Sequence, residues 1–108
     1  MIEKFKNKII KRNKLELFTK EDALSFINEC EKNSIVIFGI DGFYLTEKTI
    51  QPSMENSLDF GNLPLNVEEL VTHKGIYYIA ETFLNNTKDE KLYFEIVYDE
   101  NQPDITNI

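Results

Sequence analysis

The chain of 108 residues has few of the residue types that build catalytic and metal sites. It contains one cysteine, Cys30, and one histidine, His73. A single cysteine excludes an intrachain disulfide framework. One cysteine and one histidine also leave too few of the usual ligands for a zinc site. No nucleophile motif accompanies His73, so we expect it to be a surface residue near a helix end. The sequence therefore predicts a protein that is not an enzyme and that has no cofactor and no metal.

Long apolar stretches are also missing, and no run approaches the roughly 20 residues that span a bilayer. The N-terminus has lysines but lacks the apolar centre of a secretory signal. Apolar residues make up 42% of the chain and charged residues 29%, which is typical of a soluble globular protein. A chain of this length can bury a core of its own. We expect one cytoplasmic domain over residues 1–108 that does not contact membranes.

The charges are distributed unevenly along the chain. Residues 1–20 contain seven Lys and Arg against two Glu, a net charge of +5, whereas residues 21–108 contain five Lys against seventeen Asp and Glu, a net charge of −12. An acidic body repels nucleic acid and accelerates association with basic proteins. Plain solubility is the alternative explanation of the same charge. We therefore expect no nucleic-acid partner, and a basic partner if the charge serves binding.

Two helices and a short strand are expected in the first third of the chain. Apolar residues within residues 2–13 recur at helical spacing, which predicts a basic N-terminal helix or arm over residues 1–14, docked on the acidic body. Residues 15–18 favour a short strand. Thr19 is a good cap for a helix that ends near Asn33, with one apolar face that includes Cys30.

The stretch IVIFGIDGFYL predicts the central strand of a sheet, because residues 35–38 are apolar and rich in β-branched side chains. Gly39 and Gly42 bracket Asp41, and glycines in a strand indicate a bulge or a close backbone approach. After a turn at residues 46–48, a partner strand is expected to end at Pro52, because proline donates no ladder hydrogen bond.

The rest of the chain completes an α+β pattern. Residues 53–57 are expected to form a loop before a short strand at residues 58–60. A capping pattern predicts a helix from Asn66, with a break at Gly75 and helical spacing to about Asn85. Residues 91–98 alternate as in a half-buried strand, and residues 99–108 are expected to be a loose tail. This order predicts a small, mainly antiparallel sheet with helices packed on one face.

Several motifs resemble those of small bacterial immunity proteins from polymorphic toxin systems. They are the helical segment EDALSFINECEKN, the segment Gly-Ile-Asp-Gly-Phe at residues 39–43, and Gln-Pro-Ser at residues 51–53 followed by Asp59 and Phe60. The resemblance covers about residues 19–60. It implies an inhibitor that binds a cognate toxin domain and blocks its active site or an exosite. Such toxins are often basic nucleases, and an acidic inhibitor would act as a decoy for the phosphate backbone.

Acidic and aromatic side chains near the Gly-Ile-Asp-Gly segment are the candidates for partner binding, since rigid rings and carboxylates suit an interface with Arg or Lys. Phe43 is expected to be structural. The predicted binding residues are Asp41, Tyr44, Glu47, Glu55 and Asp59. Two alternatives stay open on sequence alone: Asp41 only shapes a turn or caps a backbone amide, and the tyrosines only pack in the core with their hydroxyls at its rim. An acidic adaptor or regulatory domain and a small carboxylate-dependent enzyme are the alternative functions.

Overall fold

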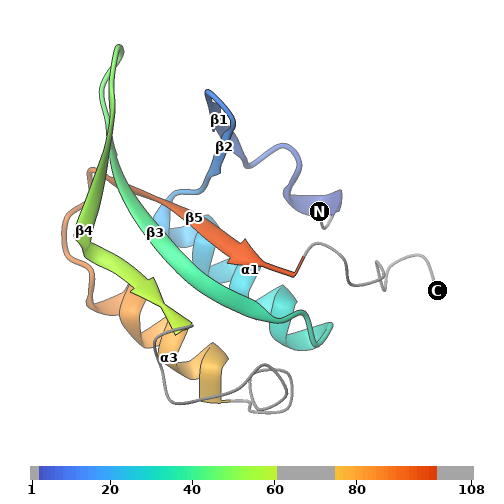
Figure 1. The fold of residues 1–108 in the computed structure, drawn as a ribbon. Coiled ribbons are helices and arrows are strands. Elements are labelled where there is room, and N and C mark those ends of the chain that lie inside the picture. Colours follow the sequence, from blue (N-terminus) through green and yellow to red (C-terminus); the bar gives the residue numbers. More distant parts are fainter. Residues whose placement is uncertain (1–2, 61–74, 100–108) are drawn as a thin grey trace.

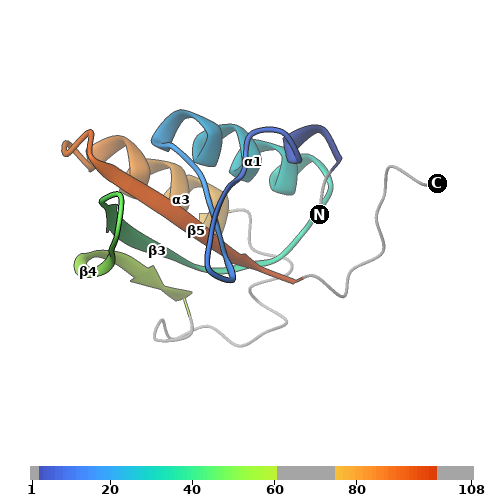
Figure 2. The ribbon, with the colours of Figure 1, turned by 90° about the horizontal axis from the view of Figure 1, so that it is seen from above.

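The computed structural model describes residues 3–60 and 75–99, which form an α+β fold (Figure 1). Its main sheet is antiparallel, with the strand order β4-β3-β5, and a second sheet pairs β1 with β2. Within the described residues, two α-helices lie side by side on one face of the main sheet (Figure 2), which confirms the predicted architecture. The elements are η1 (Glu3–Phe5), β1 (Ile10–Arg12), β2 (Leu15–Leu17), α1 (Lys20–Lys32), β3 (Ile37–Leu45), β4 (Ile50–Asp59), α3 (Gly75–Asn86) and β5 (Leu92–Tyr98).

The start of α1 follows the capping prediction. The side chain of Thr19 accepts a hydrogen bond from the backbone N–H of Asp22 at 3.3 Å. Acidic residues in the first turn favour the positive end of the helix dipole. At the other end, the Asn33 side chain donates to the carbonyl of Glu29 at 2.9 Å. The capping residues Thr19 and Asn33 therefore set the two ends of α1.

The core lies between the helices and the sheet. The α1 residues Phe26, Ile27 and Cys30 are completely buried there, so Cys30 is the core residue that its helical spacing predicted. Tyr77 of α3 is also buried, and its hydroxyl donates to the carbonyl of Ile35 at 2.8 Å. Tyr77 therefore packs in the core, which is the alternative to a role in partner binding that the sequence left open for the tyrosines. Phe43 is also buried, although outside this core cluster, which agrees with the structural role expected of it.

The predicted N-terminal helix is wrong. Only η1 is helical, as a single 3₁₀ turn, and the chain then forms the β1–β2 hairpin. Asn13 adopts a left-handed backbone conformation (φ 55°) in the hairpin turn, which asparagine tolerates better than most residues. The consecutive β-branched Ile9 and Ile10 also favour extended backbone over helix. Local turn chemistry has overridden the helical spacing.

Docking of the N-terminal segment on the acidic body is confirmed. Phe5 is only 3% exposed, and its ring meets the rings of Phe18 and Phe26 edge-on at centroid distances of 6.1 and 5.2 Å. On α1, Glu29 forms an ion pair with Lys4. A buried ring and charged contacts therefore hold this segment against α1.

The predicted end of a strand at Pro52 is also wrong. β4 continues through Pro52 and through the expected loop at residues 53–57 as far as Asp59. Pro52 is tolerated because β4 is an edge strand of this sheet, where a missing N–H on the outer side costs no hydrogen bond to a neighbouring strand. The expectations for His73 and for a helix starting at Asn66 lie outside the described residues, as does most of the expected tail. Among the helices that are described, none is long and apolar enough to cross a membrane.

Candidate functional site

A wide bulge in β4 explains the two glycines of β3. Between the pairs Ile40–Leu58 and Gly42–Ser53, β3 advances by two residues and β4 by five. A Cβ atom on Gly42 would lie 2.4 Å from the carbonyl oxygen of Asn56, and one on Gly39 would lie 2.8 Å from that of Leu58. The β4 backbone therefore rests directly on β3, and the close approach predicted for these glycines is confirmed.

Side chains within β4 hold the bulge in one shape. The Ser57 hydroxyl accepts from the backbone N–H of Gly42 at 3.1 Å and donates to the carbonyl of Ser53 at 2.8 Å. The Asn56 amide donates to the Ser53 hydroxyl at 2.9 Å. The bulge, residues 54–57, presents Met54, which is 84% exposed, and Glu55, which is also exposed. A fixed backbone thus carries an apolar and an acidic side chain into solvent.

Three carboxyl groups from three strands meet on the sheet. Asp41 of β3 pairs with Glu95 of β5, while Asp59 of β4 pairs with Gly39, two residues from Asp41. Because side chains alternate along a strand and Phe94 and Ile96 are buried in the core, Asp41 and Glu95 lie on the face away from the helices. We call Asp41, Asp59 and Glu95 the acidic sheet face.

The electrostatic environment of Asp41 reflects this grouping. Burial and the negative charge of Asp59 raise the pKa of Asp41 above its ordinary value, against a hydrogen bond with Glu95 that lowers it. Asp41 lies inside the continuous strand β3, so the alternative that it shapes a turn is wrong. The group is a half-buried carboxyl in a like-charged neighbourhood.

Tyr44 connects the strands to the loop before β5. Its hydroxyl is hydrogen-bonded to Asp89, which raises the pKa of Tyr44, and burial and the negative charge of Glu55 act in the same direction. Asp89 also accepts from the backbone N–H of Lys91 at 2.9 Å, and these contacts lower its pKa. Tyr44 and Asp89 are therefore in direct contact, and the charge of Glu55 acts on Tyr44 from a greater distance.

The five predicted residues fall into three places. Asp41 and Asp59 come together, Tyr44 lies within range of the charge of Glu55, and Glu47 stands apart in the exposed turn between β3 and β4. The sequence reasoning missed Glu95 and Asp89. The alternation of β5 had placed Glu95 on the polar side of that strand, so its pairing with the central strand was the available signal, whereas nothing local marked Asp89.

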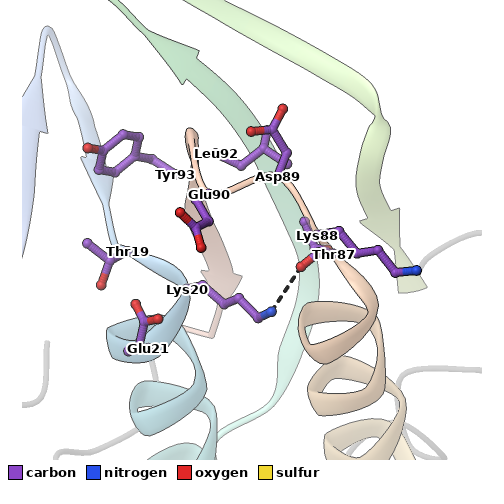
Figure 3. A pocket seen from close by; sticks show the side chains of 9 residues that line it. All are labelled: Thr19, Lys20, Glu21, Thr87, Lys88, Asp89, Glu90, Leu92 and Tyr93. Carbon is purple, nitrogen blue, oxygen red and sulfur yellow. Dashed lines mark hydrogen bonds between the residues drawn. The ribbon is translucent and has the colours of Figure 1, made fainter.

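A cavity of about 350 Å³ opens beside Asp89, between the start of α1 and the connection from α3 to β5 (Figure 3). Lys20 crosses one side of it and donates to the carbonyl of Thr87 at 2.9 Å. The lining residues are Thr19, Lys20, Glu21, Thr87, Lys88, Asp89, Glu90, Leu92 and Tyr93.

Comparison with known proteins does not identify a relative: no family model matches the chain, and no curated protein matches it. Within residues 3–60 and 75–99, no group of three or more His, Cys, Asp and Glu side chains is arranged to hold a metal ion. Burial raises the pKa of the Cys30 thiol to about 12, helped by the charge of Glu29, so this thiol stays protonated at neutral pH. The site consists of carboxylates and aromatic rings.

Proposed function

We propose that this protein is a cytoplasmic immunity protein, which binds a basic toxin domain through an acidic surface and so blocks its activity. The observation that carries the proposal is the convergence of Asp41, Asp59 and Glu95 on the side of the sheet away from the described helices. Burial and the nearby charge of Asp59 make the ionised form of Asp41 costly in the free protein. A cationic partner relieves that repulsion when it binds, which favours both affinity and rapid association.

The bulge of β4 supports recognition through side chains. Pro52 has no N–H to donate, and the bulge interrupts the regular ladder, so the β4 edge is poorly suited to pairing with a strand of another protein. Met54 and Glu55 instead stand out from a backbone that is already fixed. A preformed surface loses little conformational entropy on binding. An apolar residue beside carboxylates is typical of a protein–protein interface.

The proposal is tested by capture followed by a functional assay. The tagged protein is used to capture partners from a lysate of its source at low and at high salt, and bound proteins are identified by mass spectrometry. We expect one stoichiometric partner with a basic domain, whose retention falls at high salt because exposed charges are screened. That domain is then expressed alone in cells, where we expect growth arrest.

Co-expression with the present protein should restore growth if it is the inhibitor. A partner that binds tightly but whose activity continues unchanged in the complex would overturn the immunity function and favour the adaptor alternative. Purified partner domain, assayed with and without an equimolar amount of the protein, gives the same distinction without dependence on expression levels in cells.

A further inference from the structure

The cavity between α1 and the start of β5 has a composition suited to a cation. Glu21, at the start of α1, and Glu90, in the loop before β5, direct their carboxylates into the cavity (Figure 3). The ring of Tyr93 forms another wall of the cavity. The Lys20 ammonium is bound to the carbonyl of Thr87, and Lys88 points away from these carboxylates. The groups that face the space are therefore two carboxylates, one aromatic ring and Lys20, whose ammonium is engaged by a carbonyl oxygen.

Carboxylates combined with an aromatic ring recognise guanidinium well. Arginine forms paired hydrogen bonds with carboxylates and stacks on aromatic rings, whereas lysine offers a compact charge that does neither as well. A volume of about 350 Å³ is at the lower end of the range for ligand sites, which fits one long side chain better than a folded segment. The chemistry thus favours an arginine side chain.

The cavity is connected to the proposed binding surface through Asp89. This residue lines the cavity and is hydrogen-bonded to Tyr44, on which the charge of Glu55 in the β4 bulge also acts. We infer that the cavity is a socket for an arginine side chain of the protein partner, which would reach it past the β4 bulge, because Tyr44 packs on the helix side of the sheet and the acidic sheet face is on the other side. This inference rests on the proposed function only for the source of the arginine.

The socket is tested with argininamide as the probe and citrullinamide, its uncharged counterpart, as the control. Amide signals of the ¹⁵N-labelled protein are followed by NMR while each probe is added. We expect argininamide to shift signals of residues 19–21 and 88–93, with a dissociation constant on the order of 1–10 mM for a fragment of about a dozen heavy atoms. Absence of localised shifts, or equal shifts with citrullinamide, would overturn the inference.

Two double variants separate specific binding from general charge. Glu21→Gln/Glu90→Gln should weaken argininamide binding at least about tenfold. Glu31→Gln/Glu81→Gln, which removes the same charge from the helices outside the cavity, should leave it unchanged. Equal losses in both variants would contradict a socket. Because the probe experiment needs no partner protein, its result is independent of whether capture and co-expression support the immunity function.

Discussion

Carboxylates on α1 and carboxylates on the main sheet meet different neighbours. On α1, Glu29 lies against Lys4, and the hydrogen bond with this lysine is the main reason that the pKa of Glu29 falls below its ordinary value. On the sheet, burial and then the negative charge of Asp59 raise the pKa of Asp41. The first arrangement stabilises the fold, whereas the second stores repulsion that a cationic partner can release. The comparison separates acidic residues that serve the structure from those that we propose serve binding.

The largest expected effect is loss of the contact that holds the N-terminal segment. Phe5→Ala removes a buried ring from the cluster with Phe18 and Phe26. We expect the free energy of unfolding to fall by about 3–5 kcal/mol, measured by urea denaturation. Partner binding should survive at temperatures where the variant stays folded, because the acidic sheet face is elsewhere. Lys6→Ala, at an exposed position next to Phe5, is the matched control and should change stability by less than about 0.5 kcal/mol.

Gly42→Ala tests the other region through its backbone. The new Cβ would lie 2.4 Å from the Asn56 carbonyl oxygen, so β4 must move away from β3. We expect a loss of about 2–3 kcal/mol in urea denaturation, together with weaker partner binding because the bulge shifts. Gly39→Ala, with a nearest contact of 2.8 Å, should cost less. Equal and small losses in both variants would show that the bulge is free to adjust.

The sequence predicted these glycines better than it predicted the strand opposite them. Gly39 and Gly42 indicated that another backbone segment lies close to β3, because only a residue without a Cβ atom allows such contact. This prediction did not require knowing which segment that is. Pro52 and the polar residues 53–57 then suggested a broken strand, since local propensity does not reveal that β4 lies at an edge where proline is tolerated. The N-terminal helix failed for a different reason: the turn at Asn13 and the extended preference of Ile9 and Ile10 favour the β1–β2 hairpin over the helical spacing.

The candidate surface was predictable only in part. Asp41 and Asp59 stand on strands that the turn at residues 46–48 brings together, but a regular hairpin would place residue 54 opposite Asp41. Asp59 comes close to Asp41 only because of the bulge in β4, which the sequence did not predict. Glu95 approaches Asp41 only because β5, distant in sequence, pairs with the opposite side of β3. Asp89 enters through a hydrogen bond with Tyr44. Contacts that depend on strand order cannot be read from residue spacing.

Charge reversal should affect binding more than stability. Glu55→Lys/Asp59→Lys changes two exposed positions, and we expect affinity for the basic partner to fall on the order of 100-fold in calorimetry while the urea midpoint stays nearly constant. Glu31→Lys/Glu81→Lys changes the net charge equally on the helices and should have a much smaller effect on binding. Similar losses in both variants would mean that only net charge matters, which would remove the acidic sheet face from the proposed function.

The smallest effect is the most direct test of the comparison, because the two regions should respond to pH with opposite signs. Asp41 has a raised pKa, so its ionisation destabilises the folded state, and the stability that it withholds at neutral pH returns as pH falls through its folded-state pKa. Asp41→Asn should therefore stabilise the protein at pH 7, by about 0.2–1 kcal/mol, because burial and the charge of Asp59 both penalise the ionised carboxylate that the substitution removes. This gain should disappear below the unfolded-state pKa of aspartate, about 3.9.

Lys4→Met should behave in the opposite way. Glu29 has a lowered pKa, so its pairing with Lys4 contributes stability above the unfolded-state pKa and loses it as pH falls through the folded-state pKa. The variant should be less stable than the original protein at pH 7, by less than about 1 kcal/mol as for other exposed ion pairs, and equally stable at acidic pH. Urea denaturation of both variants between pH 3 and pH 7 measures both trends. If the two differences had the same sign at pH 7, the carboxylates of α1 and of the sheet would not have the separate roles assigned to them.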